Sequence, residues 1–217
     1  QLTKSDIWKL RAVYDSGSGS TDALLPTLNV DNDTEQLTVG ENITGQTSGA
    51  KGIVITASLT AITYVIVSGT FEVGELIGGD ISGNNKIVSS VVAGSTNITE
   101  KYELDNGQRD NFYNHGSIKL KAGQTGPTGR ISVVFDYFIH SGVGYLSADS
   151  YTAAVGFSNI PSYTSPITGE KVELRDCVDF RPRRTDDAVT ISNIELPFPN
   201  TNWQADYSYY LPRTDTV

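Results

Sequence analysis

The sequence contains few of the residues that crosslink a chain or bind metal ions. Its 217 residues include one cysteine, Cys177, two histidines, His115 and His140, and no methionine. One cysteine excludes an internal disulfide, and the histidines have no cysteine or histidine neighbour at the spacing of a zinc site. We therefore expect no metal and no cofactor. Because the chain starts at Gln1 and lacks methionine, we also expect it to be a fragment of a longer protein or the ordered part of one.

Long apolar runs and clusters of positive charge are also missing. No segment approaches the roughly 20 apolar residues that a membrane-spanning helix needs, and no signal peptide is visible. The chain has 16 lysines and arginines against 25 acidic residues, a net charge of −9. Binding to nucleic acid depends on clustered basic residues. We therefore expect neither a membrane span nor a nucleic-acid partner.

Glycine and alternating apolar residues are abundant instead. There are 21 glycines, and charged residues make up only 19% of the chain, a balance typical of β-proteins with many turns. Apolar residues alternate along 117–121, 131–139 and 203–211, and a period of two predicts strands. The loop "AGQTGPTG" predicts that the first two of these segments form a hairpin. Residues 7–14 fit a strand or a helix, and the following "DSGSGS" favours a strand.

One stretch of the sequence occurs twice. "LTVGENITGQTSGAKGIV" (37–54) and "FEVGELIGGDISGNNKIV" (71–88) agree at 9 of 18 positions at an offset of 34. The shared residues are Val39/Val73, Gly40/Gly74, Glu41/Glu75, Ile43/Ile77, Gly45/Gly79, Ser48/Ser82, Gly49/Gly83, Ile53/Ile87 and Val54/Val88. One such unit cannot bury both faces of its strands, but two units related by a pseudo-twofold axis can close a small barrel or sandwich.

These patterns predict an all-β chain with a β-sandwich or barrel-type domain that carries an inserted, internally duplicated β-module. We expect residues 1–30 to be the first part of the main domain. Residues 31–100 form the inserted module in this interpretation, and residues 101–217 form the remainder of the main domain.

The segment with the best claim to catalysis is "ELRDCVDFRPRRTDD" (173–187). Glu173, Asp176 and Asp179 could supply a pair of carboxylates for acid–base hydrolysis. The same segment contains Arg175, Arg181, Arg183 and Arg184. Because no spacing fixes two carboxylates on one cleft, a network of structural ion pairs is the preferred interpretation. No nucleophile elbow, phosphate loop or dinucleotide fingerprint is present. We predict that the chain is not an enzyme.

Two further patterns suggest ligand sites. Asp31, Asp33 and Glu35 alternate as they do in calcium loops, but the glycine and the distal glutamate of such a loop are missing, which favours a solvated turn. The aromatic residues Trp203, Tyr209 and Tyr210 are candidates for stacking on sugar rings. Alternation places the first two on one face with apolar neighbours, which favours core packing, and leaves Tyr210 on the opposite face.

Several longer stretches resemble a family of uncharacterised domains in virion structural proteins of tailed bacteriophages. They are "YELDNGQRDNFYNHGSIKLK" (102–121), "GRISVVFDYFIHSGVGYLSADSY" (129–151), "IPSYTSPITGEKVELRDCVDFRPRR" (160–184) and "YYLPRTDTV" (209–217). Such proteins occur notably in contractile-tailed phages of marine cyanobacteria. Within 102–121, "LDNGQRD" contains a turn signal at Asn106-Gly107, and Arg109 is placed to pair with Asp105 or Asp110.

The resemblance implies that the chain is part of a virus particle. It supplies no catalytic residue. We expect a non-enzymatic structural protein of a phage tail, baseplate or tail fibre, assembled in the host cytoplasm, a location consistent with one cysteine. Its expected partners are copies of itself, with a homotrimer favoured, and other tail or baseplate proteins. A carbohydrate-binding module that contacts a host-surface glycan is one alternative, and a subunit of a bacterial extracellular filament or adhesin is another.

Overall fold

The computed structural model describes residues 1–31, 34–109, 112–138, 148, 156–160, 162–164, 168–179, 181 and 184. In this part of the chain the regular elements are β-strands and single turns of 3₁₀ helix, and six of the strands close a barrel. The prediction of an all-β fold of barrel or sandwich type is therefore confirmed. His140 and the expected strand at 203–211 lie outside the described residues.

The barrel contains both copies of the repeat. Its strands are β2 (Thr27–Val30), β3 (Asn42–Gly45), β4 (Lys51–Ala57), β5 (Ala61–Ser68), β6 (Leu76–Gly79) and β7 (Asn85–Val92). Their order around the barrel is β2-β5-β4-β3-β6-β7. At the offset of 34, β2 corresponds to β5, β3 to β6 and β4 to β7, and this exchange maps the ring of strands onto itself. The two copies are therefore related by a pseudo-twofold axis.

The copies are interleaved around this ring. The first strand of each copy pairs with the last strand of the other: β2 pairs with β7, and β5 pairs with β4. The repeated apolar residues Ile43, Ile77, Val54 and Val88 are fully buried in one shared core, where the Tyr64 ring also packs edge-on against Phe71. Because neither half has a closed sheet alone, closure of the barrel needs both copies.

A second sheet is built on the N-terminal strand. β1 (Ile7–Asp15) pairs with β11 (Ile131–Tyr137) along its length and with β8 (Thr96–Asn97) at its end. This confirms the strand interpretation of residues 7–14. Register shifts between Ile7 and Lys9 and between Leu10 and Ala12 interrupt the alternation. They explain why Trp8 is exposed although Ala12 and Tyr14 are buried.

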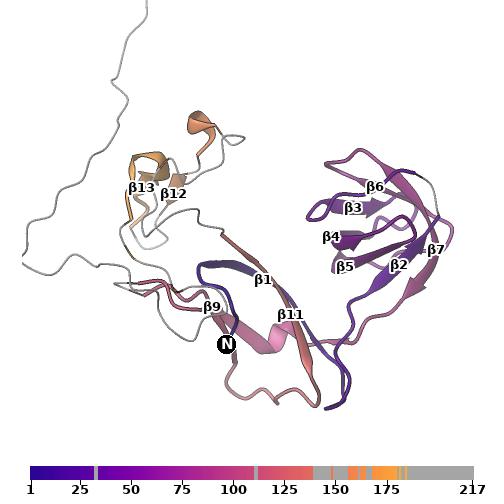
Figure 1. Cartoon of the computed structure of the whole chain (residues 1–217), viewed down its shortest axis with the longest axis horizontal. Coiled ribbons are helices and arrows are strands. Elements are labelled where there is room, and N and C mark those ends of the chain that lie inside the picture. The colour runs from indigo at the N-terminus through magenta and orange to yellow at the C-terminus, as the bar shows by residue number, and fades with distance from the viewer. Residues whose placement is uncertain are drawn as a thin grey trace, which may run out of the picture.

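The predicted hairpin between 117–121 and 131–139 is wrong. β10 (Ser117–Leu120) pairs with β9 (Tyr102–Asp105), and β11 pairs with β1 instead. The glycine-rich loop therefore joins two sheets. Tyr102 and Ile118 from the β9–β10 pair cover one face of the β1 sheet, where they pack with Val13. A last pair, β12 (Ser162–Thr164) and β13 (Lys171–Glu173), lies on the side of the β1 sheet away from the barrel (Figure 1).

The barrel occupies the connection between β1 and β8 (Figure 1). It begins at Thr27, so β2 precedes the boundary at residue 31 that the sequence suggested. Tyr14 of the β1 sheet packs with Ala23 and with Val65 of β5, and Ile55 of β4 lies against the same cluster. Burial raises the pKa of the Tyr14 hydroxyl.

The two copies differ on the surface that makes this contact. Ile55 and Val65 point outward from the barrel onto the β1 sheet. Their equivalents at the offset of 34 are Ser89, which is exposed, and Asp31, which is half-buried. An apolar outer face is favourable only where a neighbour covers it. The sequence therefore diverged at these two pairs of equivalent positions, where one member of each pair contacts the rest of the chain.

Candidate functional site

Each copy of the repeat supplies a buried glutamate that binds a turn of the other copy. Glu41, which is fully buried, accepts hydrogen bonds from the backbone N–H groups of Ile81 at 3.1 Å and Ser82 at 2.9 Å, and from the Ser82 hydroxyl at 3.0 Å. It also accepts the N–H of Thr38 in its own turn at 2.5 Å. All these donors are neutral. A buried carboxylate is tolerated here because oriented N–H and O–H dipoles replace its lost water.

Glu75 makes the equivalent contacts in the opposite direction. It accepts the N–H of Ser48 at 3.0 Å, the Ser48 hydroxyl at 2.9 Å, the N–H of Thr47 at 3.3 Å and that of Glu72 at 2.6 Å. Burial opposes the ionisation of Glu75, but the hydrogen bonds from Ser48, Glu72 and Thr47 outweigh it and lower its pKa. We call these two arrangements the carboxylate clamps, Glu41–Ser82 and Glu75–Ser48.

Glycines make room for the clamps. A Cβ atom at Gly79 would overlap the Glu41 carboxylate, and one at Gly45 would overlap that of Glu75. The shared glycines of the turns have positive φ, with 91° at Gly40 and 88° at its equivalent Gly74. The residues that the two copies share are therefore mainly those of the clamps and of the common core.

A buried lysine lies where the acidic run Asp31–Glu35 suggested a calcium loop. Lys86 is 1% exposed, and its Nζ atom donates to the backbone oxygens of Asp31 at 3.3 Å and Leu59 at 3.5 Å. The carboxylate of Asp31 accepts the N–H of Ile87 at 2.8 Å. The ammonium group therefore binds the carbonyl oxygen of Asp31 and that of Leu59 in the turn between β4 and β5, and the Asp31 carboxylate binds the backbone of β7. Asp33 lies outside the described residues.

The segment after β9 forms the tight corner that Asn106-Gly107 predicted. Gly107 has a φ of 87°, and its N–H donates to Asp105 at 3.0 Å. Arg109 makes a two-pronged ion pair with Asp105, with both distances 2.9 Å, and Lys119 of β10 lies 3.1 Å from the same carboxylate. The hydrogen bond from Arg109 is the main cause that holds the pKa of Asp105 well below its usual range.

A second ionic group joins this corner to the segment that begins at Asp179. The Arg181 guanidinium donates three hydrogen bonds to Asp179, at 2.6, 3.0 and 3.1 Å, and one to the backbone oxygen of Arg109 at 2.9 Å. Its guanidinium lies 4.4 Å from the centre of the Tyr113 ring, and the Tyr113 hydroxyl donates to Asp179. Burial opposes ionisation of Asp179, but Arg181 and Tyr113 together lower its pKa to about 2.

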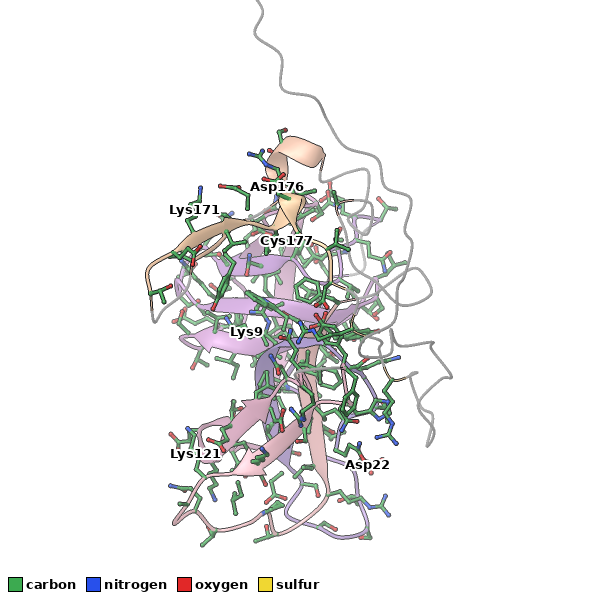
Figure 2. All side chains as sticks on the ribbon, turned by 90° about the vertical axis from the view of Figure 1, so that its left-hand side faces the viewer. Lys9, Asp22, Lys121, Lys171, Asp176 and Cys177 are labelled. Atoms are coloured by element: carbon green, nitrogen blue, oxygen red, sulfur yellow. The ribbon has the colours of Figure 1, made fainter. Side chains whose placement is uncertain are left out.

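The three carboxylates considered for catalysis have separate surroundings. Asp179 belongs to the ionic group with Arg181, and Glu173 pairs with Lys171 at 2.7 Å. Asp176 is exposed on a turn of 3₁₀ helix, Leu174–Asp176, and Cys177 follows it, half-buried (Figure 2). The pair of Asp179 with Arg181 is one that the preferred interpretation predicted, whereas the Glu173 pair is with Lys171, a residue outside the predicted set.

Other candidate groups fall into three categories. The proposed sugar-stacking residues Trp203, Tyr209 and Tyr210 lie outside the described residues. Within the described part of the chain, no cluster of three or more His, Cys, Asp or Glu side chains is arranged to hold a metal ion. A shallow, mainly apolar hollow lies between the segment before β2 and the barrel, lined by residues that include Leu24, Ile55 and Val92.

The described helices include none that is long and apolar enough to cross a membrane. No family model, curated protein or solved structure matches the chain. Its function is therefore inferred from its own residues and their geometry.

The clamps were not predicted from the sequence, although a signal for them is present in it. Glu41, Glu75, Ser48 and Ser82 are all among the nine shared positions. An apolar core does not require a charged residue that is repeated together with a serine seven positions later. It indicates a polar contact that both copies need, and the pseudo-twofold axis makes that contact reciprocal.

Proposed function

We propose that this chain is a non-enzymatic structural protein of a bacteriophage tail, baseplate or tail fibre, and that it works as a homo-oligomer, with a trimer favoured. The resemblance of 102–121 and 160–184 to domains of phage virion proteins supports this location in the particle. The observation that carries the non-catalytic role is that four of the described carboxylates are each bound by structural groups. Glu41 and Glu75 bind turns, and Asp105 and Asp179 bind arginines.

The architecture supports the same role. The barrel occupies the connection between two neighbouring strands, β1 and β8, of one sheet. The two segments that connect the barrel to this sheet lie side by side, because Leu24 and Ser95 are joined by two hydrogen bonds of 2.8 and 2.9 Å. An inserted module whose two connections leave side by side can be carried by a scaffold without disrupting it. Such modules suit particles in which one protein must contact several neighbours.

Immunogold electron microscopy tests the location. An antibody raised against the 217-residue chain is expected to label the tails of purified particles of the phage that encodes it. Labelling of capsids alone, or absence of the chain from purified particles by mass spectrometry, would overturn the proposal. Surface labelling of intact bacterial cells in the absence of phage would favour the filament or adhesin alternative.

A further inference from the structure

Two exposed apolar features of the molecule have surroundings of different charge. The first lies at the start of β1. Trp8 is 66% exposed and Phe138 49%, and their rings meet edge-on with centres 5.9 Å apart. Lys9 follows Trp8 and is exposed. We call Trp8, Lys9 and Phe138 the basic aromatic patch.

The second feature lies on the barrel. Val39 is 63% exposed and Ile81 68%, and the turns that carry them are both held by the Glu41 carboxylate, through the N–H groups of Thr38 and Ile81. Exposed Asp80 lies next to Ile81. Residues 27–92 contain seven acidic side chains and two lysines, a net charge of −5. We call Val39, Asp80 and Ile81 the barrel tip.

Both features expose large apolar side chains to solvent. Large exposed aromatic side chains commonly mark interaction sites, and tryptophan is enriched among residues that dominate binding energy. The barrel tip is fixed by a buried clamp, so little conformational entropy is lost when it binds. Opposite charges around two apolar centres favour their encounter and their orientation.

We propose that the barrel tip of one copy of this chain binds the basic aromatic patch of a second copy. The patch lies away from the contact between the barrel and β1, because that contact is at Tyr14 and Trp8 lies six residues earlier, about 20 Å along an extended strand. The contact joins two different surfaces, so it is head-to-tail. Repetition closes a ring where the rotation between copies permits it and extends a filament where it does not.

This inference rests on the homo-oligomer in the proposed function and specifies its interface. A threefold rotation between copies would give the favoured trimer. The test uses the whole chain and measures its mass by light scattering and sedimentation equilibrium over a range of concentrations. Wild-type protein is expected to be larger than a monomer. Trp8→Ala in the patch and Val39→Asp at the tip are each expected to weaken self-association tenfold or more.

The duplication offers a matched control. Val73 is the equivalent of Val39 in the second copy and is equally exposed, at 66%, but its turn is held by the other clamp, beside Thr47 in place of Ile81. Val73→Asp therefore adds the same charge to an equivalent turn outside the barrel tip. It is expected to leave the mass unchanged.

Mixing the two test variants gives the sharpest readout. Trp8→Ala protein retains an intact tip, and Val39→Asp protein retains an intact patch, so the mixture can form one native contact. We expect a heterodimer that does not grow further, although each variant alone is monomeric. Wild-type protein that is monomeric at all concentrations would overturn the proposal, as would equal effects of Val39→Asp and Val73→Asp.

Two other results would assign the patch a different occupant and also overturn the proposal. If Trp8→Ala lowers the melting temperature without changing the mass, residues of the same chain cover the patch. If it abolishes glycan binding without changing the mass, the occupant is carbohydrate. Neither result affects the proposed location in the tail, because immunogold labelling tests that location and does not depend on the mass of the oligomer.

Discussion

The hydroxyl of Ser82 donates to the carboxylate of Glu41 at 3.0 Å across 41 residues of sequence. Its counterpart, the contact from Ser48 to Glu75, has a length of 2.9 Å and spans 27 residues. Each contact joins a strand start in one copy to a turn in the other. The duplication is therefore a structural requirement, because each copy completes the polar core of its partner.

Replacement of Glu41 by glutamine tests the first clamp. An amide has one acceptor oxygen, so its NH2 group would face either the N–H of Thr38 or those of Ile81 and Ser82, which would leave a buried donor without an acceptor. We expect a loss of about 3 kcal/mol in the free energy of unfolding. Glu72→Gln is the control, because Glu72 lies in the equivalent turn of the other copy with an exposed side chain, and a change within about 0.5 kcal/mol is expected. Urea denaturation followed by circular dichroism measures both. Equal losses would show that the clamp contributes nothing specific.

The glycines beneath the clamps give a second prediction. Gly79→Ala places a methyl group against the Glu41 carboxylate, and we expect it to destabilise the barrel by about 2 kcal/mol. Gly19→Ala is the matched substitution, because nothing lies within 4 Å of a Cβ atom at Gly19. It should be neutral or slightly stabilising, since alanine restricts the unfolded chain. Thermal unfolding of the two variants compares them directly. A stable Gly79→Ala protein would mean that Glu41 can move without cost.

The extent of the barrel gives a third prediction. A fragment of residues 31–100 lacks β2, which bridges β5 and β7, so its sheet cannot close. A fragment of residues 23–95 retains all six strands and both ends of the connection between Leu24 and Ser95. We expect the longer fragment to unfold cooperatively and the other to lack a cooperative transition. Amide-exchange NMR on both fragments distinguishes these outcomes. Cooperative folding of residues 31–100 would show that β2 is dispensable.

The pH dependence of stability should depend on Asp179. Its pKa in the folded protein is about 2, below the ordinary value of 3.8, so ionised Asp179 stabilises the fold above pH 4 by roughly 2 kcal/mol. This contribution is lost as the pH falls toward 2. Asp179→Asn should therefore be less stable than the wild type at pH 7, and the difference should shrink between pH 4 and pH 2.

Asp176→Asn serves as the control for this titration, because Asp176 is exposed on its turn of helix. Its difference from the wild type should stay near zero at every pH. Denaturation at each pH gives both curves. A constant gap between Asp179→Asn and the wild type would mean that the Asp179–Arg181 pair does not stabilise the ionised carboxylate.

The sequence by itself determined the class of the fold and the local geometry. Period-two alternation and abundant glycine predicted strands, the duplicated stretch predicted a closed unit of two halves, and Asn106-Gly107 predicted the corner at which Arg109 pairs with Asp105. These features depend on neighbouring residues or on a repeat visible within one chain, so a pattern is enough to find them.

Only the tertiary structure decided which distant segments meet. The alternation of residues 131–139 is equally compatible with pairing to β10 or to β1, and the contacts of Val133 and Val134 with two different clusters favoured β1. The sequence likewise could not show that Glu41 serves the turn at Ser82 and not its own Ser48. That choice follows from the pairing of β3 with β6, which places Glu41, just before β3, beside the turn at Ser82, just after β6.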